Sequence, residues 1–387
     1  MNSTVQSDST AQAGEATRRK RVGRFRRFRQ RIKDFWYRVS EGRQVNDLWK
    51  QFTADARASY GFYGKDVGWE ELQKVPRWRR PFHTAKEFFW ALILKLAPAR
   101  RVLLLIAIVW LVLAEASKGS EFVVVIALLL LLSFELADKV IMKRDLEIAR
   151  EIQSWLVPAH PPAVAGADIA FATRPQNSVA GDYYDAFFPA GDAGAGSKLV
   201  LVIADVVGKS VPAALLMATL QASLRTIAGE GVTLGELVVR LNRYACAHSL
   251  DGLRFTTAVI CEYDPQTRRL SYVNAGHNEP ILRRASGALE KLETGGLPLG
   301  IRFPFDYETA SVEVQPGDAL IFYTDGVVEA FNERGEEFGN ERWANAIRAL
   351  PSMSAEKSLQ FLMEAVDGFV GGTRQSDDIT CMVFRGV

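Results

Sequence analysis

Two long apolar runs constrain this chain more than any other feature of its sequence. Residues 102–114 read VLLLIAIVWLVLA and residues 122–134 read FVVVIALLLLLSF, 13 residues each. Neither run has the polar face that a surface helix of a soluble domain carries. Each is shorter than the roughly 20 residues that cross a bilayer, but both approach that length when their flanks are included. We therefore predict two short hydrophobic helices over 101–142, forming a membrane hairpin, with a buried hairpin of a soluble domain as the alternative.

The orientation of this hairpin is predicted by the basic residues around it. The loop between the runs, around 118–120, carries only Lys118. The outer flanks carry Arg100, Arg101, Lys139, Lys143 and Arg144. By the positive-inside rule, both termini are then expected in the cytoplasm, at the cytoplasmic membrane.

The charge of the chain is as unevenly distributed as its hydropathy. The formal net charge is +2, yet residues 1–101 hold 23 Lys+Arg against 10 Asp+Glu, which leaves 24 against 35 for the remainder. Residues 1–44 are predicted to be a basic, largely disordered tail, with ten basic side chains between 18 and 33. A basic, aromatic-studded segment ahead of a hydrophobic region favours an anionic membrane surface over nucleic acid, and a solvated basic helix is the alternative. Residues 45–100 are rich in aromatic side chains and are interpreted as a juxtamembrane region.

A linker helix is predicted over 143–158. Residues 145–156 (DLEIAREIQSWL) place Leu146, Ala149, Ile152 and Leu156 on one face, and the prolines that follow end the helix. Because it joins the hydrophobic region to everything after it, we expect it to transmit a signal and to support a homodimer.

From about residue 163 the pattern changes to short β-like runs with helices between them. We predict strands over 199–204, 256–263, 270–274, 280–284, 319–323 and 379–384, and helices over 212–227, 234–248 and 355–369. Strands in runs joined mostly by short turns indicate an α+β sandwich rather than a parallel βαβ sheet. The last domain is therefore predicted to span 163–387.

Four short acidic motifs fall at the ends of strands in this domain. They are GDYYD (181–185), ADVVGK (204–209), TDG (324–326) and SDDIT (376–380). A single aspartate at such a place is most often a turn residue, but four sites in one domain suggest ligands for a hard cation. The few histidines and cysteines are too scattered to form a zinc site, so the expected ions are Mg²⁺ or Mn²⁺.

These motifs, in one order with NAGHNEP and GLPLGI, resemble the metal-dependent PPM serine/threonine phosphatases related to protein phosphatase 2C. The resemblance is strongest to the bacterial SpoIIE-like branch and covers about 150–387, but not the basic tail or the hydrophobic region. It implies a phosphatase 2C-like antiparallel β-sandwich flanked by helices, with a site for two divalent cations at one edge. Small residues, Ala180 and Ser210, stand at two positions where this family often has glycine.

Carried over motif by motif, the resemblance implies a ligand set for the two cations and a set of neighbouring groups. The implied metal ligands are Asp182, Asp205, Asp325 and Asp377, with the carbonyl of Val206 as a further donor. Asp378 is expected to be a neighbour rather than a ligand, and Asp185 could orient a water. His277 is either a proton donor to the leaving serine oxygen or the structural cap of a turn. Lys209 and Arg174 are either substrate contacts or solvated surface charges.

The function predicted on this basis is a membrane-anchored protein serine/threonine phosphatase that uses a water activated by two metals. The resemblance implies a phosphorylated regulator of the anti-anti-sigma (STAS) type, in a partner-switching pathway, as its substrate. The absence of a CxxxxxR loop agrees with a mechanism without a covalent intermediate. A catalytically silent scaffold on the same fold is the main alternative, although all four acids are retained. A nucleotidyl cyclase or nuclease is disfavoured because the sequence has no Gly-rich nucleotide loop.

Overall fold

The computed structural model describes residues 96–113, 121–189, 197–249 and 254–387, with scattered positions between 76 and 90. Two compact units are present, Met1–Leu136 and Ala137–Val387. The predicted basic tail (1–44), most of the aromatic-rich region and the loop at 118–120 lie outside the described residues.

The two hydrophobic runs are helical. Helix α5 is Pro98–Leu113, and α6 is the 36-residue helix Glu121–Leu156. The second hydrophobic helix and the linker helix, predicted separately, are one continuous helix, because neither Gly nor Pro interrupts 122–156. Within the first unit, the guanidinium of Arg100 binds Glu135 at 2.8 Å and joins α5 to α6.

Length and hydropathy together single out one of the described helices as a candidate membrane span, and it is α7, Val211–Ala228. This helix belongs to the second unit and buries Met217 and Leu224 in a hydrophobic core, as the core helix of a soluble domain does. Insertion of the α5–α6 hairpin into a membrane stays a prediction.

The second unit contains two five-stranded sheets, and every pair of neighbouring strands within them is antiparallel. The first sheet has the order β1 (Ala167–Arg174), β10 (Ile379–Gly386), β9 (Ala319–Tyr323), β6 (Ile281–Arg283) and β7 (Leu289–Lys291). The second has the order β2 (Tyr183–Phe187), β3 (Leu199–Val206), β4 (Thr256–Asp264), β5 (Arg269–Ala275) and β8 (Ala310–Glu313).

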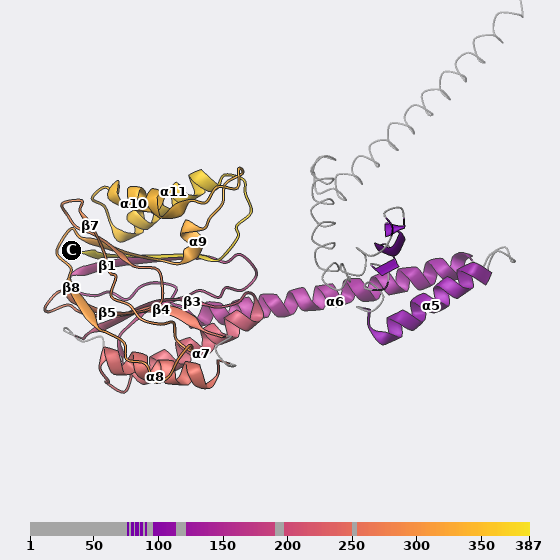
Figure 1. Ribbon diagram of the computed structural model, residues 1–387, viewed down its shortest axis with the longest axis horizontal. Coiled ribbons are helices and arrows are strands. Elements are labelled where there is room, and N and C mark those ends of the chain that lie inside the picture. The colour runs from indigo at the N-terminus through magenta and orange to yellow at the C-terminus, as the bar shows by residue number, and fades with distance from the viewer. Residues whose placement is uncertain are drawn as a thin grey trace, which may run out of the picture. The chain divides into compact units, whose positions relative to one another are not determined.

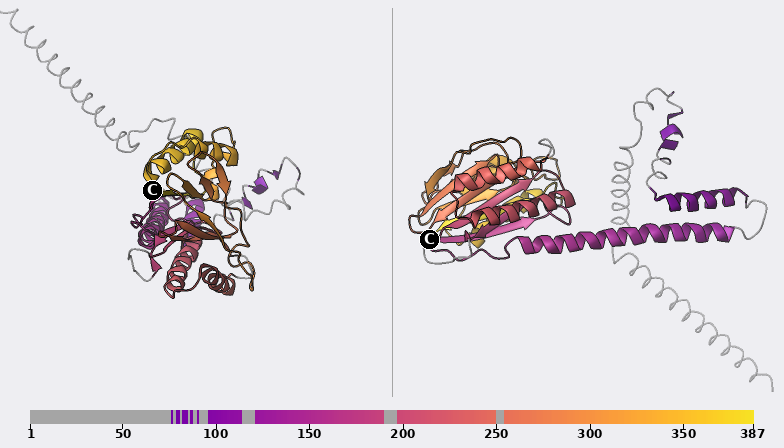
Figure 2. Two further views of the ribbon diagram at one scale, coloured as in Figure 1. Left: turned by 90° about the vertical axis from the view of Figure 1, so that its left-hand side faces the viewer. Right: turned by 90° about the horizontal axis from the view of Figure 1, so that it is seen from below.

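The sheets pack face to face, and helices cover both outer faces (Figures 1 and 2). Helix α7 and α8 (Leu234–Ala247) lie on the second sheet. Helices α9 (Asp325–Val328), α10 (Gly339–Arg348) and α11 (Ala355–Val370) lie on the first. The predicted α+β sandwich is confirmed, and so are its predicted strands and helices, to within a few residues at their ends.

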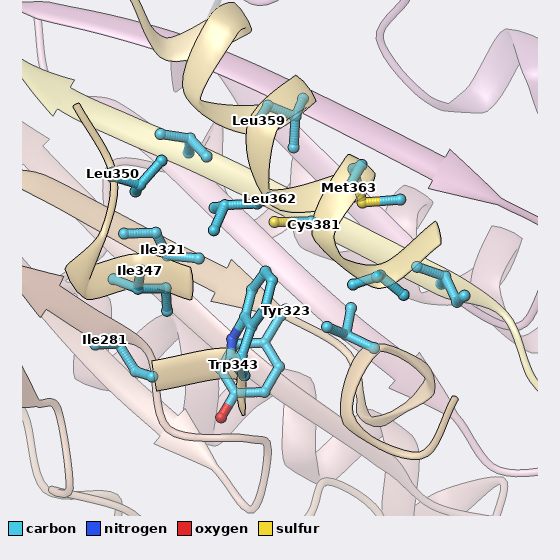
Figure 3. Close-up of a cluster of buried hydrophobic side chains, with 14 of the residues drawn as sticks. Ile281, Ile321, Tyr323, Trp343, Ile347, Leu350, Leu359, Leu362, Met363 and Cys381 are labelled. Atoms are coloured by element: carbon cyan, nitrogen blue, oxygen red, sulfur yellow. The ribbon is translucent and has the colours of Figure 1, made fainter. Parts of the chain in front are cut away.

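The alternation of side chains along the strands builds three apolar layers. In β9, Phe322 faces the opposite sheet, whereas Ile321 and Tyr323 point to α10 and α11. Figure 3 shows this outer layer, in which Tyr323 lies against the fully buried Trp343 with ring centroids 5.4 Å apart. The strands that carry the acidic motifs are thus buried on both faces, which fixes where each strand ends.

Candidate active site

The antiparallel register brings the four acidic motifs to one end of the sandwich. Asp182 precedes β2, and Tyr183 pairs with Ala204, so Asp182 lies beside Asp205 at the end of β3. In the other sheet, Asp325 follows β9, and Asp377 precedes the neighbouring strand β10. Each aspartate is therefore positioned by a buried strand.

Hydrogen bonds across the sandwich hold the two pairs of strands together at this end. The Thr324 hydroxyl donates to Asp182 Oδ2 at 2.9 Å, and its oxygen accepts the Thr380 amide at 3.0 Å. Thr324 is fully buried, so the contact is shielded from water. It links the end of β9 to the start of β2, and its buried hydroxyl was not identified as a site group from the sequence.

Asp378 ties the start of β10 to the loop before β2. Its Oδ2 accepts the Gly181 amide at 2.6 Å and its Oδ1 accepts the Gln176 amide at 2.7 Å. The Val206 carbonyl packs over Gly181, where a Cβ would stand only 3.1 Å from it. Asp378 thus holds the loop that leads to Asp182, and Gly181 allows the Val206 carbonyl to approach; the role of Asp378 as a neighbour of the metals stays a prediction.

Lys209 is the cation that the structure brings into this cluster. Its Nζ lies 2.8 Å from Asp377 Oδ2 and 3.0 Å from the Ser376 carbonyl. The next residue, Ser210, precedes α7 with φ 64° and ψ −146°, a conformation that favours glycine. The start of α7 is therefore strained at the residue that follows Lys209.

The convergence of carboxylates has a large electrostatic effect. Burial and the neighbouring Asp325, Asp377 and Asp378 raise the pKa of Asp205 to about 7. Burial, followed by the charge of Asp205, raises the pKa of Asp182 well above its usual range. The pKa of Asp325 is raised by burial and by Asp377. Without a counter-charge, these groups resist full ionisation.

The donor set fits hard divalent cations. In the described part of the chain, no three carboxylate, imidazole or thiol groups meet closely enough to hold an ion by themselves. Mg²⁺, however, is commonly bound by one or two carboxylates and keeps several waters. Pairs of these aspartates, with the Val206 carbonyl, provide that kind of partial shell, and bound cations would relieve the repulsion.

Asp185 lies away from the acidic cluster, on the face of β2 that packs against α7. It is fully buried and takes two hydrogen bonds from Arg225 of α7, at 2.8 and 2.9 Å. Tyr183 donates a third at 2.7 Å, and Arg225 also stacks on Phe187. These hydrogen bonds anchor α7 to β2. They also engage both oxygens of Asp185, the carboxylate that was predicted to orient a water. Arg225, 40 residues further along the chain, carried no signal in the sequence.

His277 and Arg174 also have protein partners. His277 is buried beside β4, with Nδ1 2.8 Å from the Thr257 hydroxyl, and burial lowers its pKa to about 4. Its backbone amide donates to Asn274 at 2.8 Å, which favours the structural interpretation of this turn. Arg174 pairs with Asp367 of α11.

Known proteins share this domain. Residues 195–386 match the family model described as stage II sporulation protein E (SpoIIE). Phosphoserine phosphatase RsbU of Bacillus subtilis is 29% identical over 196 residues, 50% of this chain and 56% of RsbU. Protein IcfG of Synechocystis sp. is 30% identical over 269 residues, 62% of this chain and 41% of IcfG. The chain spans about half the length of the curated relatives it matches.

Solved structures show the same fold. The SiaA-PP2C domain of Pseudomonas aeruginosa aligns with TM-score 0.56 and 20% identity, over 65% of this chain and 99% of that one. The RsbU and RsbW domains of a Mycobacterium tuberculosis protein align with TM-score 0.50 and 27% identity, over 60% and 63%. The fold is that of a PP2C-type serine/threonine phosphatase domain. Over residues 195–386, this domain is of the SpoIIE-like kind.

Gly326 offers a test of how tightly this edge is packed. A Cβ on Gly326 would collide with the carbonyl of Asp378, whose carboxylate holds Gly181 and Gln176. Because the backbone of Asp378 would have to move, we expect Gly326→Ala to lower the free energy of unfolding by about 2 kcal/mol or more. Denaturant titration measures this change.

The matched control is Gly368→Ala in α11, where a Cβ meets no atom within 4 Å. Replacing a helical glycine there should raise stability by about 0.5–1 kcal/mol. Equal effects of the two substitutions would contradict the close approach of Asp378 to Gly326.

Proposed function

We propose that this chain is a metal-dependent protein serine/threonine phosphatase anchored at the cytoplasmic face of a membrane. The observation that supports it best is the convergence of Asp182, Asp205, Asp325 and Asp377 from both sheets. The SpoIIE-like domain over residues 195–386 supports the reaction class. The exposed apolar side chains of α5 and α6, such as Val109 and Leu132, support the anchor.

In this proposal, the acidic edge holds two divalent cations, Mn²⁺ or Mg²⁺, through Asp182, Asp205, Asp325, Asp377 and the Val206 carbonyl. Such ions supply a water nucleophile at neutral pH and neutralise phosphoryl oxygens. Asp378 and Thr324 hold the carboxylates in place through the hydrogen bonds described above. Lys209 keeps Asp377 oriented and adds positive charge at the point where a phosphate would enter.

The substrate that we propose is a phosphorylated regulator of the STAS type in a partner-switching pathway. RsbU, a relative, is named a phosphoserine phosphatase, and in the Mycobacterium tuberculosis relative an RsbU domain accompanies an RsbW domain.

The cysteines Cys261 and Cys381 are fully buried, and burial raises their thiol pKa values, so neither is available as a nucleophile.

Neutralising one central carboxylate tests the metal assignment. We expect Asp205→Asn and Asp325→Asn each to reduce Mn²⁺-dependent hydrolysis of p-nitrophenyl phosphate by about a hundredfold or more, because each removes a charged ligand. The control, Asp306→Asn, changes an exposed aspartate outside the cluster and should retain wild-type activity. Retained activity in both cluster variants would falsify the assignment.

The pH dependence of metal stabilisation gives a second test. Because the pKa of Asp205 is raised to about 7, the metal-free folded state binds a proton there more tightly than the unfolded chain does. That contribution to stability is present below the ordinary aspartate pKa and is lost as the pH rises through about 7. Mn²⁺ competes with the proton, so we expect it to raise the melting temperature clearly at about pH 8 and little at about pH 5. Equal shifts at both values would contradict this.

Regulation is proposed to act through α6 and its dimerisation. Near the end of α6, the Gln153 side chain donates to the Ala180 carbonyl at 2.7 Å and accepts the Ala180 amide at 3.0 Å. Ala180 lies two residues before Asp182, so a change in α6 reaches the metal edge through this pair of hydrogen bonds. Gln153 is thus a positioning residue.

We expect Gln153→Ala in the full-length chain to weaken Mn²⁺ binding, measured by calorimetry, by about threefold to tenfold, the loss of roughly one net hydrogen bond. The control, Gln360→Ala, removes an exposed glutamine of α11 that bonds only Glu364 among the described residues. Unchanged Mn²⁺ affinity in the Gln153 variant would mean that α6 does not act through this contact.

A further inference from the structure

A polar cavity adjoins the acidic edge and is not used by the chemistry above. Its volume is about 450 Å³, within the range of ligand-binding pockets. The wall is formed by Leu146 and Arg150 of α6, the segment 176–179, Ser210 and Arg374. All of these belong to the second compact unit.

The only titratable groups in this wall are two arginines, Arg150 and Arg374. Both are exposed, and within the described residues neither forms an ion pair. The neighbouring cations differ in this respect, since Arg174 pairs with Asp367 and Lys209 with Asp377. The cavity therefore carries two positive charges that no ion pair among the described residues neutralises.

Gln176 places this cavity directly beside the predicted site of phosphate hydrolysis. Its side chain lines the cavity, while its backbone amide donates to Asp378 Oδ1 at 2.7 Å. Its Oε1 lies 3.4 Å from Lys209 Nζ, which in turn contacts Asp377. A peptide whose phosphoserine reaches the aspartates would therefore pass beside the cavity whose wall carries Arg150 and Arg374.

We propose that the cavity binds acidic side chains next to the phosphoserine of the protein substrate. The inference rests on the proposed phosphatase activity and defines the class of substrate that the site prefers. Guanidinium groups recognise carboxylates through paired N–H donors, and Asn177 and Ser178 add neutral polar groups to the same wall. A substrate with neutral flanks would leave both arginines without a partner.

Two synthetic phosphoserine peptides test this, one flanked by glutamate and the other by glutamine at the same positions. For the full-length chain with Mn²⁺ at low salt, we expect kcat/KM for the acidic peptide to exceed that for the neutral one about fivefold to thirtyfold, as two exposed ion pairs allow. The double variant Arg150→Glu/Arg374→Glu should reduce this ratio to one or below. The milder double variant Arg150→Gln/Arg374→Gln should reduce this ratio to near one.

The matched control is Arg348→Glu/Lys357→Glu, an equal change of charge at exposed positions of α10 and α11. It should keep the wild-type ratio. Raising the salt from about 50 to about 500 mM should reduce the wild-type ratio without any substitution.

A wild-type ratio near one, or an unchanged ratio in both arginine variants, overturns this inference alone. If neither peptide nor p-nitrophenyl phosphate is hydrolysed with Mn²⁺, the proposed function fails, and this inference fails with it.

Discussion

The repulsion among five aspartates at one edge is the constraint on which the rest of the domain depends. Carboxylates at close range cannot all ionise freely, and burial raises the pKa values of Asp182, Asp205 and Asp325. A fold can keep such an edge only if the backbone around it is rigid. The apolar layers on both faces of β3 and β9 provide that rigidity. Asp378 adds to it by tying the start of β10 to the loop before β2 with two amide hydrogen bonds.

Helix α7 is fixed at two places, at β2 through Arg225 and at the acidic edge through its first turn. The half-exposed Arg225 anchors it to the fully buried Asp185, and the position of α7 is well defined because Arg225 occupies both carboxylate oxygens. Its first turn follows the strained Ser210, directly after Lys209. Strain of this kind persists only where the surrounding structure determines the backbone. The anchor of α7 therefore also fixes the position from which Lys209 reaches Asp377.

Sequence patterns could predict the parts of this structure that depend on local information. Strand β3 is a strongly apolar run with Asp205 near its end, and the apolar β9 is followed by Thr324 and Asp325, so the strands and these acids were predictable. Strands β1, β2, β7 and β8 and helices α9 and α10 were not predicted. Strand β2 contains the charged Asp185, so its sequence does not have the pattern of a buried strand. The charge is neutralised by Arg225, which comes from a helix distant in the sequence. Contacts such as Thr324 with Asp182 depend on how two sheets meet, and no spacing along the chain encodes that distance.

One face of α6, near its end, carries both residues of the proposed peptide site and the residue that holds the backbone before Asp182. Leu146, Arg150 and Gln153 are spaced four and three residues apart, which places them on the same face. The first two line the cavity beside the acidic edge, and the third holds the backbone of Ala180. A rotation of this helix would move both groups together. The same movement that shifts the loop of Asp182 would also withdraw the Arg150 guanidinium from the proposed peptide site, so metal binding and substrate recognition would change as one.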